Sequence, residues 1–274
     1  MKIKDIEVEN WNEFEKKLKE LYIRHPEKPE GGGYHSRFVF RGQADSGWDL
    51  ETTLDRDVTV NMPQLDYYRT ITYVKPQIET FTGERWNIPS TREHPASSEK
   101  VKMDALEEPI ALEYMIYLRH HGFPSPLLDW TRSYYIAAFF AFDGFVEKKD
   151  SKDVAIYVYR EWAGKGKSSS SDAPWVMKSI CHNVKTHRRH FIQQCEYTLC
   201  HEIKNKEAVY GSHEYVFSDE KEYQNLIWKF IIPKKEFIPV QKKLDEMNIN
   251  AYSLFGSEES LMKTIALREF KLKE

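Results

Sequence analysis

The chain has 274 residues, with 40 Lys and Arg against 43 Asp and Glu, and a formal net charge of −3. This near balance argues against a protein that binds nucleic acid through a general basic surface. Hydrophobic residues make up 41% of the chain, which is enough for a large core, and the length suits one large domain or one domain with additions.

The cysteines, Cys181, Cys195 and Cys200, include no C-x-x-C pair. This set predicts neither a disulfide framework nor a zinc finger, and no metal is expected. The first residues lack the apolar segment of a secretory signal, and the longest apolar run, 134–142, is too short to span a bilayer. These features predict a soluble protein of a reducing cytoplasm with no membrane partner.

Periodic apolar positions predict the secondary structure along the chain. Helices are expected over 10–24, 63–80, 107–121, 134–146, 235–247 and 257–271, and strands over 37–42, 153–160, 192–200 and 226–233. Loops are expected over 83–105, 122–133 and 164–174. Because helices gather early and late with strands between them, the pattern favours an α+β fold with a mixed or antiparallel sheet core and flanking helices. Residues 1–36 form an N-terminal helix and connector, and 37–274 form the main domain, the two together making one compact unit.

The strand "RFVFRG" ends in an arginine and a glycine. If Phe38 and Phe40 face the core, Arg41 faces the other side of the sheet. A guanidinium binds phosphate or carboxylate with two hydrogen bonds, and Gly42 would let a ligand approach the backbone closely. A ligand-binding arginine and a structural salt bridge both remain open, with Gln43 completing the motif.

A second motif, "LLDWTRS", precedes the alanine-rich helix that begins at 134. Thr131 or Ser133 is expected to cap that helix, whose free N–H groups can also receive an anion or an amide oxygen. Its three alanines would let it pack tightly. The alternative is that Asp129, Trp130 and their neighbours serve capping and core packing alone.

A third motif, "QQCEYTL", predicts a strand with two different faces. One face carries Cys195, Tyr197 and Leu199, and the other carries Gln194, Glu196 and Thr198. Glu196 could accept a hydrogen bond from a sugar hydroxyl or stabilise developing positive charge, although an exposed polar face is the alternative. The basic cluster "KTHRRH" at 185–190 could bind phosphate, but a solvated turn is favoured, and the histidines lack metal-ligand spacing.

The first two motifs resemble those of the FRG domain family, named for its Phe-Arg-Gly signature. The segments are "FVFRGQADSGWDLETTLDR" and "HHGFPSPLLDWTRSYYIAAFFAF", with a weaker third in "QQCEYT", and the likeness covers about 37–267. Pro126 stands where the family usually has arginine, Ser125 where it has threonine, and Cys195 where it has glycine. The family occurs in bacterial and phage conflict proteins, which implies a defence or toxin-like role.

The order of the three motifs also resembles, more distantly, that of arginine-type ADP-ribosyltransferases. This resemblance implies an ADP-ribosyltransferase-like fold, NAD as the substrate and a protein or nucleic acid as the acceptor. Cleavage of nicotinamide passes through an oxocarbenium-like ribose, as glycoside cleavage does.

The same resemblance implies a role for each motif residue. Glu196 would bind the ribose 2′-hydroxyl and stabilise the cation, Gln194 would orient the acceptor, and Arg41 would hold the pyrophosphate. The rest of the expected NAD-binding set is Gly42, Gln43, Asp129, Trp130, Thr131, Ser133 and Tyr134, with Thr131 and Ser133 supporting the nicotinamide pocket and Trp130 or Tyr134 stacking on the nicotinamide.

Two other classes of function remain open at this stage. A non-enzymatic module that senses a nucleotide or a protein would use the same cleft. A nuclease using Asp129 and His120 is the least favoured, because no second carboxylate has metal-site spacing. The sequence leaves the oligomeric state open.

Overall fold

The computed structural model describes residues 3, 5–27, 35–58, 61–93, 109–144, 153–163, 175–180, 184, 186–205, 207–217 and 224–273. The loop expected over 164–174 lies outside the described residues, as do Cys181 and part of the loop expected over 83–105.

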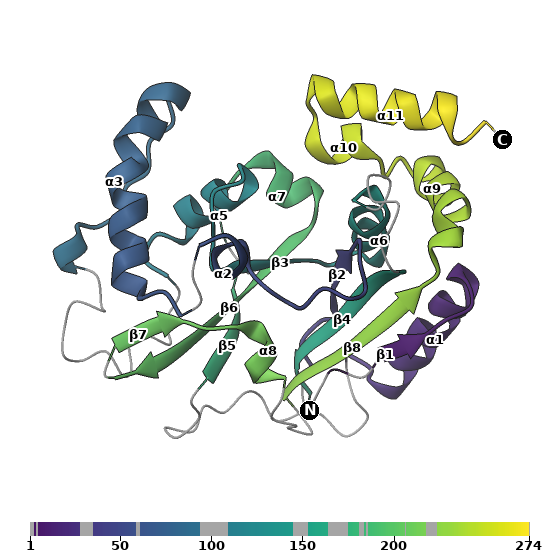
Figure 1. Ribbon diagram of the computed structural model, residues 1–274, viewed down its shortest axis with the longest axis horizontal. Coiled ribbons are helices and arrows are strands. Elements are labelled where there is room, and N and C mark those ends of the chain that lie inside the picture. Colours follow the sequence, from purple (N-terminus) through teal and green to yellow (C-terminus); the bar gives the residue numbers. More distant parts are fainter. Residues whose placement is uncertain are drawn as a thin grey trace.

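One mixed sheet of eight strands forms the centre of the molecule (Figure 1). Its strand order is β1-β8-β4-β2-β3-β6-β5, and β7 pairs with β6 beside this path. The β1–β8 pair is parallel, and the other described pairs are antiparallel. The strands are β1 (Asp5–Glu7), β2 (Val39–Gln43), β3 (Leu127–Thr131), β4 (Val154–Trp162), β5 (Trp175–Ile180), β6 (Cys195–Lys204), β7 (Glu207–Tyr210) and β8 (Gln224–Ile232).

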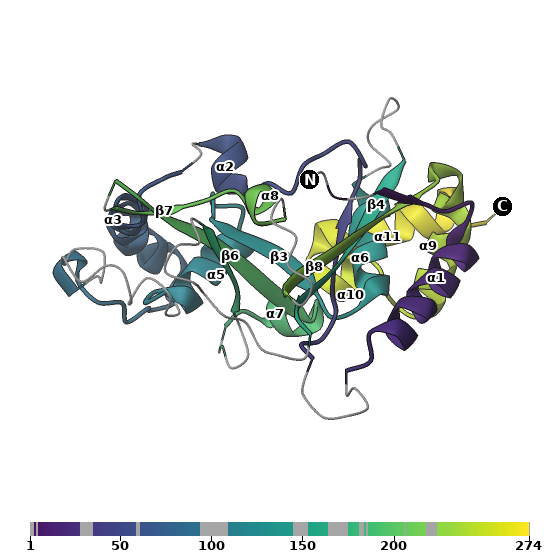
Figure 2. The ribbon, with the colours of Figure 1, turned by 90° about the horizontal axis from the view of Figure 1, so that it is seen from below.

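Helices flank this sheet, which confirms the expected α+β class. Figures 1 and 2 show α1, α9 and α11 towards one end of the sheet and α3 at the other. The α-helices are α1 (Trp11–Arg24), α2 (Thr53–Asp57), α3 (Gln64–Thr82), α5 (Leu112–His120), α6 (Tyr134–Asp143), α7 (Arg188–Ile192), α8 (His213–Val216), α9 (Phe237–Glu246), α10 (Ala251–Phe255) and α11 (Glu258–Phe270). Two 3₁₀ turns, η1 (Thr91–Glu93) and η4 (Lys234–Glu236), complete the described elements.

The segment 122–133, expected to be a loop, contains a central strand. Pro124 and Pro126 precede β3 rather than interrupt it, since the strand begins at Leu127. Leu127 and Leu128 are both fully buried, on opposite faces of the sheet. A strand buried on both faces lacks the polar alternation that identifies strands in a sequence. The strand expected from about 192 begins at Cys195, because α7 occupies Arg188–Ile192.

Buried apolar residues form three clusters on the two faces of the sheet. The first cluster joins β2, β4 and β8 to α1, α6 and α9. The second cluster joins β3 and β6 to α3 and α5. The third cluster lies on the opposite face of the sheet from the other two. Phe38 and Phe40 belong to the first cluster and Val39 to the third, which confirms the predicted alternation along β2.

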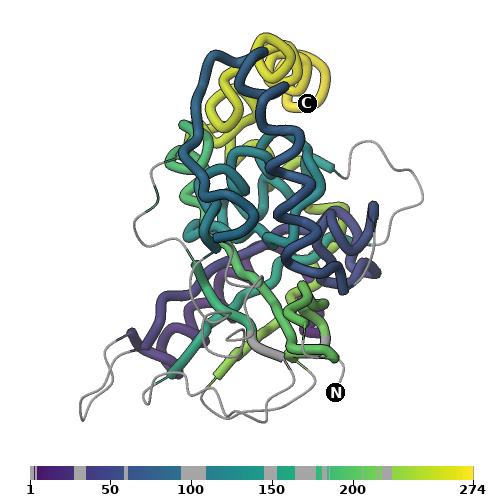
Figure 3. Tube along the Cα trace, turned by 90° about the vertical axis from the view of Figure 1, so that its left-hand side faces the viewer, coloured from purple at the N-terminus to yellow at the C-terminus, as the bar shows by residue number. Residues whose placement is uncertain are grey.

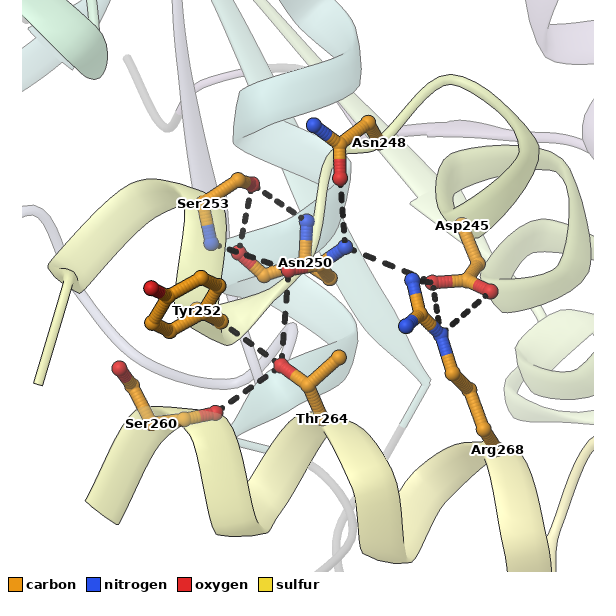
Figure 4. Close-up of polar contacts among 8 residues, drawn as sticks. All are labelled: Asp245, Asn248, Asn250, Tyr252, Ser253, Ser260, Thr264 and Arg268. Atoms are coloured by element: carbon orange, nitrogen blue, oxygen red, sulfur yellow. Dashed lines mark hydrogen bonds and ion pairs between the residues drawn. The ribbon is translucent and has the colours of Figure 1, made fainter. Parts of the chain in front are cut away.

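The C-terminal helices are joined by a network of polar side chains (Figure 4). The Asn250 side chain accepts a 3.0 Å hydrogen bond from the Ser253 nitrogen and thereby caps α10. The Thr264 hydroxyl on α11 accepts a 2.9 Å hydrogen bond from the Tyr252 nitrogen. Arg268 pairs with Asp245 at 2.8 Å and so ties α11 to α9. Figure 3 shows these helices at one end of the molecule, with the N-terminal residues towards the other.

Among the described residues, no helix combines the length and the apolar character needed to cross a bilayer.

Candidate functional site

The sheet opens between β2 and β3, and a cavity lies at this opening. The register pairs β2 with β3 at Phe40 and Thr131 only, whereas β2 pairs with β4 along the whole of Val39–Gln43. The cavity has a volume of about 920 Å³, which is in the range of small-molecule sites. Its walls come from the first cluster on one side and from α5, β3 and β6 on the other.

Gly42 forms the wall where β2 meets α6. A methyl group added to Gly42 would lie 1.9 Å from the Ala137 carbonyl oxygen and 2.7 Å from the Ala141 nitrogen. The backbones of β2 and α6 are therefore in direct contact, as the alanine-rich sequence of the helix predicts. The absence of a side chain at Gly42 thus allows α6 to pack directly against β2. Gly42 also lines the cavity.

Arg41 bridges the opening between the two strands. Its Nη1 donates a 2.9 Å hydrogen bond to the main-chain carbonyl of Asp129 on β3. Its buried Nε has no hydrogen-bond partner within the described part of the chain. Burial lowers the pKa of Arg41 to about 10, and the charge of Asp129 acts in the opposite direction. The guanidinium is therefore charged at neutral pH and keeps an unused donor.

The carboxylate of Asp129 is held by a second arginine, Arg119, on α5. Arg119 Nη2 donates a short charged hydrogen bond to Asp129 Oδ2, and its Nη1 donates to the Thr53 hydroxyl at 3.3 Å. Burial alone would raise the pKa of Asp129, but the charges of Arg119 and Arg41 outweigh it and lower that pKa. Asp129 is therefore ionised at neutral pH, and its buried Oδ1 atom is unpaired among the described residues.

Within the described part of the chain, four arginines line the cavity. Besides Arg41 and Arg119, these are Arg56 on α2, which is exposed, and Arg189 on α7. Arg189 Nη1 donates a 3.3 Å hydrogen bond to the main-chain carbonyl of His120, and its buried Nε is unpaired within the described structure. Guanidinium groups gathered around a cavity favour a ligand with phosphate or carboxylate oxygens.

Aromatic side chains line the same cavity. They are Trp48 after β2, Phe140 on α6 and Phe255 on α10. The Arg189 guanidinium lies 5.6 Å from the centre of the Phe255 ring, within the range of a cation–π contact. The cavity thus combines surfaces for an anion with surfaces for a flat apolar group, as a nucleotide requires.

Six of the residues expected to bind NAD line this cavity. They are Arg41, Gly42, Gln43, Asp129, Trp130 and Thr131. The Thr131 hydroxyl donates a 2.7 Å hydrogen bond to the Gln193 carbonyl and so fixes the segment that enters β6. The Trp130 indole nitrogen donates to the Thr198 hydroxyl at 2.9 Å, on the face that belongs to the third cluster.

The other two residues expected to bind NAD lie at the start of α6. Ser133 is its N-cap, and its hydroxyl accepts a hydrogen bond from the Ile136 nitrogen. Tyr134 packs against the first cluster, with its ring 6.2 Å from that of Trp11. Neither residue is among the described residues that line the cavity.

Glu196 and Gln194 also lie outside the cavity lining among the described residues. Glu196 sits opposite Trp130 in the β3–β6 ladder, and its carboxylate lies 3.8 Å from the Arg132 Nε. In a sheet, Cys195 and Tyr197 therefore point to the cavity side while Glu196 points to the other. Gln194 is exposed, adopts a φ of 49°, and lines a smaller hollow together with Arg132.

The sequence pattern does not identify Arg56, Arg119 or Arg189 as site residues. Arg56 is the last residue of the first motif segment, and Arg119 directly precedes the second, so both lie at the border of a segment that the sequence singles out. Arg189 belongs to the "KTHRRH" cluster, for which the sequence favours a solvated turn. The structure places Arg189 in the cavity wall instead.

The fold and the cavity define an α+β protein with an arginine-lined site between two diverging strands. Residues 36–151 match the family model of the FRG domain. The chain therefore carries an FRG domain, as its Phe-Arg-Gly and Leu-Asp-Trp-Thr motifs indicate. The comparisons with curated proteins and with solved structures give no match.

Proposed function

We propose that the cavity between β2 and β3 binds a nucleotide, with its phosphates on the arginines and its base against the aromatic side chains. The observation that carries this proposal is the set of unpaired buried atoms in the cavity residues: Nε of Arg41, Arg119 and Arg189, and Oδ1 of Asp129. An unpaired buried polar atom costs stability, so a ligand that pairs with it gains affinity.

Calorimetric titration of the full chain with ADP, and with adenosine as the matched probe without phosphate, tests this proposal. ADP is expected to bind and adenosine to bind far more weakly. Arg56→Ala should weaken ADP binding about 10-fold, because one charged hydrogen bond is lost from an exposed position that does not support the core.

Arg69→Ala is the matched control, because Arg69 is an exposed, ion-paired arginine on α3 outside the cavity lining. ADP binding that is absent, or that responds equally to Arg56→Ala and Arg69→Ala, would refute the proposal. Equal affinity for adenosine would remove the role given to the arginines.

A second candidate is cleavage of NAD with transfer of ADP-ribose to a protein or nucleic-acid acceptor. One observation favours it: the strands that carry the three motifs, β2, β3 and β6, are neighbours in that order in the sheet. In this hypothesis Arg41 holds the pyrophosphate. The defence or toxin-like setting in bacteria or phages stays a prediction from the family resemblance.

Chromatographic measurement of nicotinamide release from NAD separates the two candidates. Release by the wild type that Arg41→Ala abolishes would support the enzyme. Glu196→Gln then tests the predicted catalytic carboxylate, which here lies on the side of β6 away from the cavity. ADP binding without nicotinamide release, whichever acceptor is added, would leave a sensing module.

A further inference from the structure

Three potential metal ligands meet in one wall of the cavity. A nitrogen of His120, a nitrogen of His190 and the Cys195 sulfur all lie within 4.8 Å of one another. They come from three elements, since His120 ends α5, His190 lies on α7 and Cys195 begins β6. His120 and Cys195 also line the cavity. Because 70 residues or more separate His120 from the others, spacing along the chain gives no sign of this cluster.

The chemistry of this set is specific. Two imidazoles and one thiolate suit Zn²⁺, whereas Mg²⁺ and Ca²⁺ prefer oxygen ligands. Around a tetrahedral ion with bonds of about 2.0 to 2.3 Å, neighbouring ligand atoms lie roughly 3.3 to 3.8 Å apart. The observed separations are within about 1 Å of this arrangement, a difference that side-chain rotation covers.

The hydroxyl group of Tyr197 stands beside the cluster. It lies 2.7 Å from His120 Nε2 and 3.3 Å from His190 Nδ1. Tyr197 follows Cys195 by two residues on β6, so both side chains point to the same face. The hydroxyl therefore joins the two imidazole rings on the face of β6 that carries the thiol.

We propose that His120, His190 and Cys195 bind one Zn²⁺ ion in the cavity wall, with the Tyr197 oxygen beside its fourth coordination position. The thiolate and the nearby Asp129 carboxylate supply negative charge against the arginines of the same wall. None of its three ligands is an arginine assigned to the phosphates, so the test of this metal site does not require the nucleotide to bind.

A titration of the metal-stripped full chain with Co²⁺ tests the site, because Co²⁺ replaces Zn²⁺ and reports a bound thiolate through an intense near-ultraviolet band. One equivalent per chain is expected to produce this band, and Zn²⁺ is expected to remove it. Cys195→Ser should abolish the band. His190→Ala should weaken binding roughly 10-fold or more, since even outer partners of a metal site contribute on that scale.

The chain offers a matched control for each ligand type. Cys200→Ser changes the other described cysteine of β6, and His121→Ala changes the exposed neighbour of His120; both should leave the titration unchanged. Circular dichroism establishes that each variant is folded. If Cys195→Ser does not fold, His190→Ala decides the question, because His190 is only partly buried. Absence of the thiolate band, or its persistence in both ligand variants, would overturn the proposal.

Discussion

The cavity and the C-terminal network are both rich in polar side chains, yet they differ in how those side chains are satisfied. Asn250, Thr264, Asp245 and Arg268 bond to one another, and none of these four has a buried side-chain atom without a partner (Figure 4). Several cavity residues, Arg41 among them, keep such atoms. A network that only joins helices is complete in the chain itself, whereas the incomplete one indicates a place for a ligand.

The largest expected effect concerns the wall that positions Arg41. Gly42→Ala should destabilise the protein by more than about 3 kcal/mol or prevent folding, because the added methyl meets rigid backbone of α6. Gly83→Ala is the control, since Gly83 has a φ of 75° and no atom within 4 Å of the added methyl. It should cost about 1 to 2 kcal/mol in urea unfolding. Equal costs would contradict the direct contact of β2 and α6.

The next effect concerns the charged pair in the cavity. Asp129→Asn should lower the free energy of unfolding by about 2 kcal/mol. This is less than the loss of a fully buried ion pair, because 34% of the Asp129 side chain is exposed. Arg119 and Arg41 lower the Asp129 pKa below 3.8, so this stabilisation is present at neutral pH and is lost as the pH falls below 3.8. Urea unfolding of both proteins at several pH values measures it.

An exposed charged pair on α3 provides the control. Asp66→Asn breaks an exposed pair with Arg69 and should cost less than about 0.5 kcal/mol. A difference between wild type and Asp129→Asn that stays constant down to acid pH would show that the charge of Asp129 is not what stabilises the cavity.

In the C-terminal network, Asn250→Ala should cost between about 1 and 2 kcal/mol, because α10 loses its cap and Thr264 loses a neighbour. The exposed Asn12→Ala on α1 should be near neutral. Thermal unfolding with and without ADP sharpens the comparison. The loss of stability caused by Asn250→Ala should be the same with and without ADP. A loss of stability that disappears when ADP is present would connect this network to the cavity.

The smallest effect at neutral pH concerns His213, which is fully buried on α8. Burial lowers its pKa from 6.5 to about 3; the Thr198 backbone partly opposes this shift, and the charge of Arg41 adds to it. The unfolded chain therefore binds a proton that the folded chain rejects, and stability falls as the pH drops from 6.5 towards 3. His213→Leu should reduce this slope by about 1 kcal/mol per pH unit in urea unfolding. An unchanged slope would show that the folded and unfolded chains bind this proton equally, so that burial does not lower the pKa of His213.

The sequence predicts much of the fold, and six of the ten site residues that it singles out line the cavity. Periodicity reveals α1, α3, α6, β4 and β8 because each has a long apolar pattern. It does not reveal β3, which is buried on both faces and follows two prolines. The alternation along β6 is correct, but the sequence cannot say which face meets the cavity, and Cys195 rather than Glu196 lines it. Arg119, Arg189 and the His120 cluster depend on tertiary contacts that no local pattern encodes.

The parallel pairing of β1 with β8 bears on how the chain acquires its structure during synthesis. Asp5 pairs with Lys229, and Val154 pairs with Ile232, so the central ladders cannot close until most of the chain is available. The segment 36–151 contains β2 and β3, which pair with each other only at Phe40 and Thr131, but it lacks their further partners β4 and β6. Such non-local pairing slows folding and leaves unpaired strand edges exposed meanwhile. The segment that matches the family model therefore cannot complete its part of the sheet alone, and the cavity, whose lining includes Cys195 and Phe255, requires the later elements to be in place.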